Sequence, residues 1–167
     1  VLWGMPVRRR VSCLAALSLM AWLAPALSAA QAKDDEALLE QRARFLEVRT
    51  ALEKGGEATP AIPSELETYP LYPYLVYTKL RSEIDKQTPA SIQDFLTRHG
   101  DTPLTSPLRT AWLRFLAKQG RWKDYLAFYK GSRNTAMRCH YHYAQYKAGR
   151  TKEAWKGARE LWLVGRS

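Results

Sequence analysis

The chain has 167 residues, of which 46% are apolar and 25% are charged, and its formal net charge is +10. These proportions are typical of a globular protein, and they exclude a disordered polymer or a bundle of membrane-spanning helices. About 135 residues follow an N-terminal leader, which is enough for one modest domain.

Residues 1–32 are expected to form a cleavable signal peptide. Three arginines at positions 8–10 supply a positive n-region, residues 11–27 form an apolar h-region, and Ala30-Gln31-Ala32 is the small-x-small pattern that signal peptidase accepts. The apolar stretch is shorter than the roughly 20 residues of a membrane span, and Pro25 interrupts it. We therefore expect cleavage after Ala32, export from the cytoplasm, and no membrane attachment of the mature chain.

The start of translation and the cysteines fit this interpretation. Val1 indicates a GTG start read literally, and Met5 is the alternative true start. Cys13 lies at the beginning of the apolar stretch, whereas the lipid-carrying cysteine of a lipoprotein follows it, so we expect Cys13 to be removed with the leader. Cys139 is then the only cysteine of the mature segment. Either its disulfide partner is missing from this chain or its thiol is buried.

The mature segment is basic, because removing the three leader arginines lowers the net charge only from +10 to +7. Outside the cytoplasm a basic surface meets envelope polymers and acidic lipid head groups, so we expect no nucleic-acid partner. A solvated basic surface without a dedicated partner is an equally good interpretation.

Every element that the sequence predicts is a helix, and no alternating pattern indicates a strand. Proline, serine, threonine or asparagine residues mark most of the starts, and glycines at positions 100, 120, 131 and 149 mark ends. Apolar residues recur at helical spacing in each segment. The predicted helices cover residues 34–54, 73–80, 88–99, 106–119, 122–129, 134–148 and 151–164.

One five-residue pattern occurs twice. Gly120-Arg-x-Lys-Asp124 and Gly149-Arg-x-Lys-Glu153 lie 29 positions apart, and each closes one helix and opens the next. Short helices joined by glycine turns at a period of roughly 30 to 35 residues are typical of helical-repeat proteins. We therefore predict an all-α fold, a right-handed superhelix (α-solenoid) of short antiparallel helix hairpins. The apolar last turn, residues 161–164, lacks a polar capping helix, which predicts that the sequence is a fragment cut where a further repeat would dock.

The residues predict no catalytic, cofactor-binding or metal site. The cluster Cys139-His140-Tyr141-His142 offers two zinc ligands on one helix face, and His99 is the only other histidine, which does not complete a site. Nucleophile elbows and phosphate-binding glycine loops are absent from the sequence. Acidic residues occupy helix starts and turns, where structure explains them: Asp34, Asp35, Glu36, Glu65, Glu67, Asp124 and Glu153.

Aromatic residues are numerous, with four tryptophans and nine tyrosines in the mature segment. Most lie on the apolar stripes of the predicted helices, Trp112, Trp155 and Trp162 among them, so we expect them to pack in the core. A less regular set could line a surface: Tyr69, Tyr72, Tyr74 and Tyr77.

Several strings together resemble a known family. They are Glu40-Gln-Arg42, Tyr69-Pro-Leu-Tyr-Pro-Tyr-Leu75, Cys139-x-Tyr-x-Tyr-Ala144, and Glu153-Ala-Trp-x-Gly-Ala-x-Glu-Leu-Trp-Leu163 followed by Gly165-x-Ser167. Through them the chain resembles the N-terminal superhelical, U-shaped domain of the periplasmic soluble lytic murein transglycosylases. The strings are in order and span nearly all of the mature segment.

The resemblance implies that residues 33–167 are an incomplete N-terminal part of that domain. Family members carry a C-terminal lysozyme-like domain that cleaves the β-1,4 bond between N-acetylmuramic acid and N-acetylglucosamine and forms a 1,6-anhydro ring, with one glutamate as acid and then base. Nothing of that domain is present here, so no catalytic residue is assigned and the chain alone is expected to be inactive. The implied partners are peptidoglycan glycan strands and the missing lysozyme-like domain of the same protein.

Two further expectations complete the interpretation. The resemblance implies a disulfide partner for Cys139 shortly beyond the end of the chain. The alternative to the enzyme scaffold is a stand-alone periplasmic helical-repeat adaptor for protein partners.

Overall fold

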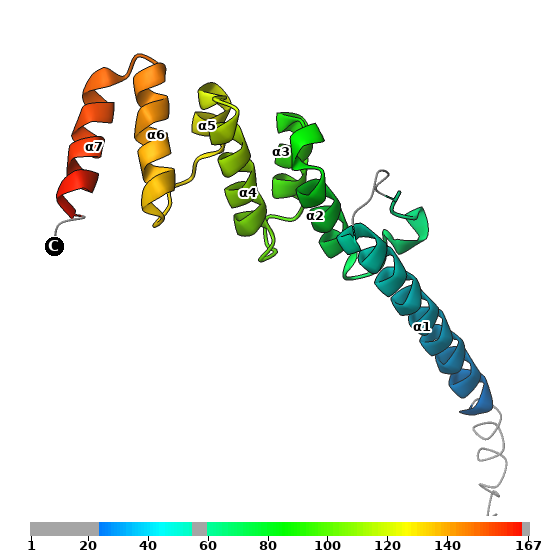
Figure 1. Cartoon of the computed structure of the whole chain (residues 1–167). Coiled ribbons are helices and arrows are strands. Elements are labelled where there is room, and N and C mark those ends of the chain that lie inside the picture. The colour runs from blue at the N-terminus through cyan, green and yellow to red at the C-terminus, as the bar shows by residue number, and fades with distance from the viewer. Residues whose placement is uncertain (1–23, 55–59, 165–167) are drawn as a thin grey trace, which may run out of the picture. The chain divides into compact units, whose positions relative to one another are not determined.

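The computed structural model describes residues 24–54 and 60–164, with the surroundings of side chains described for residues 35–54 and 60–163. Within them the fold is all-helical (Figure 1). The elements are α1 (Ala24–Lys54), η1 (Ser64–Leu66), α2 (Tyr72–Ser82), η2 (Ile84–Lys86), α3 (Pro89–Arg98), α4 (Thr105–Lys118), α5 (Trp122–Phe128), α6 (Thr135–Lys147) and α7 (Thr151–Val164), where η denotes a 3-10 helix. No helix in these ranges combines the length and apolar character that a membrane span needs.

Helix α1 differs from its prediction at the N-terminal end. It begins at Ala24, ten residues before the expected start and within the expected signal peptide. Most of the leader, residues 1–23, lies outside the described residues, and so do Gly55 and Gly56, which follow the predicted end of this helix at residue 54. Among the apolar residues that recur at helical spacing in this predicted helix, Phe45, Val48 and Leu52 are buried. Leu38 is 52% exposed, because the cluster that packs on α1 begins only at Phe45.

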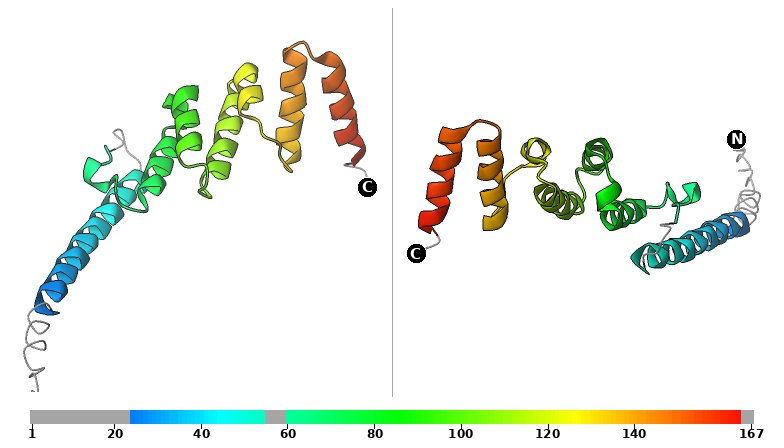
Figure 2. Two further views of the ribbon diagram at one scale, coloured as in Figure 1. Left: turned by 180° about the vertical axis from the view of Figure 1, so that it is seen from behind. Right: turned by 45° about the horizontal axis from the view of Figure 1, so that its top comes forward.

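The chain divides into two compact units at residues 44 and 45, inside α1. In the second unit, α2 and α3, α4 and α5, and α6 and α7 form successive antiparallel hairpins (Figures 1 and 2). Neighbours in the chain pack together: α4 contacts α3 and α5, and α6 contacts α5 and α7. This succession of hairpins, each packed on the next, is the arrangement that the helix pattern predicts.

Most helix starts follow the sequence signals. Thr88 caps α3, where its hydroxyl accepts a hydrogen bond from the backbone N–H of Ser91 at 3.1 Å. Asn134 caps α6 in the same way, with its side-chain oxygen accepting from the N–H of Met137 at 3.1 Å. Pro73 lies in the first turn of α2, where its missing N–H costs no helical hydrogen bond.

The repeated five-residue pattern forms the same turn twice. Gly120 has φ 68° and Gly149 has φ 80°, a left-handed conformation that glycine adopts without steric cost. The arginine after each glycine donates its N–H across the turn, to the carbonyl of Leu116 in the first copy and of Gln145 in the second, at 2.9 Å in both. This is a Schellman helix end, so the sequence repeat is a structural repeat of the hairpin turn.

Two apolar clusters hold the second unit together. The smaller joins the end of α1 to η1 and α2, and its buried members are Phe45, Val48, Leu52, Leu66 and Leu75. The larger runs from α3 to α6 and is centred on Trp112, which is 0% exposed and packs against the rings of Phe115 and Phe128 at centroid distances of 5.3 and 6.0 Å. Core packing is therefore confirmed for Trp112.

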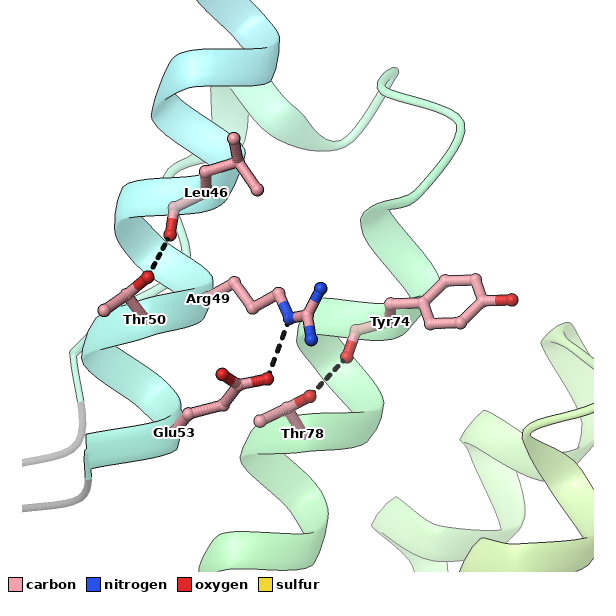
Figure 3. A network of polar contacts seen from close by, with 6 residues as sticks. All are labelled: Leu46, Arg49, Thr50, Glu53, Tyr74 and Thr78. Atoms are coloured by element: carbon pink, nitrogen blue, oxygen red, sulfur yellow. Dashed lines mark hydrogen bonds and ion pairs between the residues drawn. The ribbon is translucent and has the colours of Figure 1, made fainter.

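The polar contacts drawn in Figure 3, beside the smaller cluster, each join residues of the same helix. Arg49 donates to Glu53 one turn further along α1 at 2.8 Å, and both side chains are half exposed. The hydroxyl of Thr78 donates to the carbonyl of Tyr74 at 2.8 Å within α2. Exposed ion pairs of this kind contribute at most about 1 kcal/mol, so apolar burial dominates the packing of α1 on α2.

Tyr125 makes this structure sensitive to high pH. Its ring is 1% exposed, its hydroxyl donates to the carbonyl of Met137 at 2.8 Å, and burial together with the neighbouring Tyr129 raises its pKa to about 12. Since the folded state holds this proton more tightly than the unfolded state, its stabilising effect is complete below pH 10 and is lost as the pH rises toward 12. Between pH 9 and 11 the chain should lose about 1.3 kcal/mol more unfolding free energy than the Tyr125→Phe variant does, measured by urea denaturation. Equal losses in the two proteins would contradict this pKa.

Candidate functional site: a groove on the last hairpin

Helices α6 and α7 enclose an open groove of about 470 Å³. Its walls are almost entirely apolar. Its lining includes Cys139, His142 and Tyr143 from α6, and Trp155, Leu161 and Trp162 from α7.

Helix α7 buries one face and leaves a large aromatic face uncovered. Ala154 and Leu161 are buried against α6, whereas Trp155 is 67% and Trp162 is 72% exposed. The expectation that these two tryptophans pack in the core is therefore wrong for the described residues, because no described helix covers their side of α7. Leu163, at 63% exposure, extends the same face and agrees with the predicted uncovered last turn. Apolar side chains of this size gathered in one groove mark an interaction surface.

Gly157 sets how closely α6 and α7 approach each other. It lies in the interior of α7 and is buried, and a Cβ at this position would collide with the imidazole ring of His142. That ring is held by its Nδ1–H, which donates to the side-chain oxygen of the buried Gln145 at 2.9 Å. No role was predicted for Gly157, although the sequence carries a signal: it is the one glycine inside a predicted helix rather than at a helix end.

The cluster around Cys139 is split between two sides of α6. Cys139 and His142 line the groove, whereas His140 faces α5, with ring centroids 6.1 Å from Trp122 and 6.2 Å from Tyr125. Cys139 is exposed, so the alternative that its thiol is buried is wrong. In the part of the chain that the structure describes, no three His, Cys, Asp or Glu residues are grouped to hold a metal ion.

The four irregular tyrosines share no common surface. Tyr69 and Tyr72 pack half-buried on the smaller cluster, and Tyr77 packs on the larger one. Only Tyr74, which is 41% exposed, agrees with the prediction of a surface position.

The known proteins that resemble this chain are soluble lytic transglycosylases. No protein-family profile matches the chain. The soluble lytic murein transglycosylase of Escherichia coli K12 is 31% identical over 134 residues, which are 79% of this chain and 21% of that protein. The protein of the same name from Salmonella typhimurium LT2 gives the same identity and coverage. The chain thus spans about a fifth of the length of the curated relatives that it matches.

Solved structures agree with the sequence matches. The crystal structure of the 70 kDa soluble lytic transglycosylase from Escherichia coli matches with a TM-score of 0.68 and 32% identity, over 78% of this chain and 21% of that one. An inactive mutant of the lytic transglycosylase Slt from Pseudomonas aeruginosa matches with a TM-score of 0.65 and 36% identity, over 74% and 20% of the two chains. These matches confirm the predicted fold class, an all-α superhelix of short antiparallel hairpins. The chain is a homologue of the soluble lytic murein transglycosylases over the segment that it shares with them.

Proposed function

We propose that this chain is a scaffold segment of an enzyme that cleaves peptidoglycan by lytic transglycosylation, splitting the β-1,4 bond between N-acetylmuramic acid and N-acetylglucosamine with a 1,6-anhydro product. The observation that supports the proposal is the homology to soluble lytic murein transglycosylases over 134 residues, together with the structural match over 78% of this chain. The bond cleavage itself is assigned to a lysozyme-like domain of the same protein.

The described residues suit a scaffold better than a catalytic centre. Cleavage of a glycosidic bond requires a carboxylic acid that stays protonated near neutral pH, and burial is the usual cause of such a raised pKa. No aspartate or glutamate is buried among residues 35–54 and 60–163. Asp94 and Asp124 instead pair with Arg98 and Arg121, at 2.8 and 2.7 Å.

The groove on α7 is proposed to receive a further helix of the same protein. One hairpin earlier, the aromatic face of α5 is covered by α6: Trp122 meets Tyr143 at 4.9 Å and Tyr129 stacks on Tyr141 at 4.3 Å between ring centroids. Because the turns before α5 and α7 are copies of one motif, α7 presents the corresponding face, and Trp155 lies there uncovered. A helix with aromatic and small residues at helical spacing, such as α6 itself, fits this face.

Activity measurements test whether residues 33–167 serve as a scaffold without cleaving murein themselves. Residues 33–167 should give no clearing in a murein zymogram, whereas the whole gene product should clear it. Clearing by the segment alone would contradict the scaffold role. Reading the gene beyond Ser167 gives an independent test, since further helical hairpins and a lysozyme-like domain are expected there.

We also propose that the protein is periplasmic. The basic leader with its apolar stretch supports export and cleavage after Ala32. In the periplasm the chain would lie beside peptidoglycan. The mature protein should then begin at Lys33. Its intact mass and N-terminal peptide check this expectation.

Cys139 provides a prediction for the oxidised protein. Because its thiol is exposed at the groove and the compartment is oxidising, we expect it to form a disulfide with a cysteine beyond Ser167 in the whole gene product. Mass spectrometry of a non-reduced digest should find the Cys139 peptide cross-linked. A free Cys139 thiol in the oxidised whole protein would refute the pairing.

A further inference from the structure

A second pocket, separate from the groove, lies between α5 and α6 and has a volume of about 480 Å³. Its lining contains three cations and one large aromatic ring, Lys123, Lys147, Arg150 and Trp122, with the small apolar surfaces of leucine and alanine side chains between them. No carboxylate lines it. Lys123 belongs to the first copy of the Gly-Arg-x-Lys-acid motif and Arg150 to the second, so the hairpin repeat brings these two charges to one pocket.

The three cations are available to a ligand. Arg121, the motif cation next to the pocket, is engaged by Asp124 at 2.7 Å. By contrast, within the residues that the structure describes, Lys123, Lys147 and Arg150 form no ion pair, and all three are exposed. A ligand with negative groups therefore meets positive charge that no protein carboxylate neutralises.

Ring contacts fix the aromatic wall. Trp122 is held edge-on by Tyr143 at a centroid distance of 4.9 Å, and the ammonium of Lys147 lies 5.4 Å from the centre of the Tyr143 ring. The backbone of Arg150 is fixed by its hydrogen bond to the carbonyl of Gln145 at 2.9 Å. The ring of Trp122 is therefore fixed by its neighbours. Secondary structure sets the backbone positions of Lys123, Lys147 and Arg150, while their charged side-chain ends can move to meet a ligand.

We propose that this pocket binds a segment of a carboxylate-bearing glycan strand. A sugar ring places its apolar C–H face against the half-buried Trp122, and the carboxylate groups of the strand pair with Lys123, Lys147 and Arg150. The assignment rests on the proposed function, which makes peptidoglycan the polymer that the chain meets. It extends that function by giving the scaffold its own contact with the glycan strand.

The test compares two variants that change the same charges. The pocket triple is Lys123→Gln, Lys147→Gln and Arg150→Gln, and the control triple changes three exposed cations outside the pocket, Arg114→Gln, Lys118→Gln and Lys156→Gln. Circular dichroism checks that each purified chain is folded. The probes are peptide-free murein glycan strands, which carry carboxylates, neutral chitin oligosaccharides with the same β-1,4-linked N-acetylated sugars, and a single-stranded oligonucleotide. Affinity is measured by isothermal titration calorimetry at two salt concentrations.

The wild-type chain should bind murein strands more tightly than chitin oligosaccharides, and more weakly as salt rises. The pocket triple should lose about tenfold in affinity, because three exposed ionic contacts each contribute a few-fold, and the control triple should lose little. Equal losses in the two triples, equal binding of chitin and murein strands, or a preference for the oligonucleotide would overturn the assignment. If wild type and pocket triple bind murein equally, the pocket alone is refuted. If the wild type does not bind murein, a murein-contacting scaffold is refuted as well.

Discussion

Replacing Trp112 with alanine is expected to lower the free energy of unfolding by about 3 to 5 kcal/mol. The ring is 0% exposed at the centre of the larger cluster, where it packs on Phe115 and Phe128, so truncation leaves a cavity between α4 and α5. A loss of this size is a large fraction of the total stability of a domain of this length. Urea denaturation followed by circular dichroism measures it.

Two further variants identify the cause of that loss. Trp112→Phe should cost less than the alanine variant, because the indole Nε1 is buried without a hydrogen-bond partner and phenylalanine removes that unsatisfied group. Trp155→Ala removes a tryptophan that is 67% exposed and should change stability by no more than about 0.5 kcal/mol. A Trp155→Ala loss as large as that of Trp112→Ala would show that the two tryptophans are equally buried, against the structure.

Gly157→Ala is expected to destabilise the last hairpin by up to about 2 kcal/mol. The added Cβ collides with the ring of His142, and overpacking of this kind costs about 1 to 3 kcal/mol. The intrinsic helix propensity of alanine offsets up to about 1 kcal/mol of this cost. Gly100→Ala is the matched control, because a Cβ there would lie 3.5 Å from its nearest neighbour, the carbonyl of Leu96, at an ordinary contact distance.

A double-mutant cycle tests whether His142 causes the loss of stability in Gly157→Ala. In a His142→Ala background the obstructing ring is gone, so Gly157→Ala should stabilise α7 by its helix propensity, about 1 kcal/mol. The same substitution is therefore destabilising with His142 present and stabilising without it. If Gly157→Ala had the same effect in both backgrounds, the close approach of α6 and α7 at this point would be wrong.

Helix positions could be predicted from the sequence because their causes are local. The capping residues Thr88 and Asn134 and the turn glycines Gly120 and Gly149 act through hydrogen bonds and backbone angles within a few residues, and the structure shows them in those roles. The start of α1 was missed because Pro25, which lies in the first turn of the helix, was interpreted as a break in the apolar stretch of the leader.

The site was harder to predict, because it depends on what covers a helix. The spacing of Trp155 and Trp162 matches an apolar stripe, and this pattern is the same whether a neighbouring helix covers the stripe or not. The exposure of these two tryptophans depends on which helices pack on α7, and it is seen only in the three-dimensional structure. The contact of Gly157 with His142 joins two helices, and no spacing rule within one helix predicts it. In the basic pocket, Lys123 and Arg150 come from turns 29 positions apart, so their proximity follows from the stacking of the hairpins.

Hydrogen exchange of the tryptophan indole N–H groups, followed by NMR, is the decisive measurement of whether the hairpins form an open stack with an uncovered face on α7. Single tryptophan-to-phenylalanine variants assign the signals. We expect slow exchange for the buried Trp112 and fast exchange for Trp155 and Trp162. Equal protection of all three indoles would show that α7 is covered in a closed bundle, and the open stack would then be wrong.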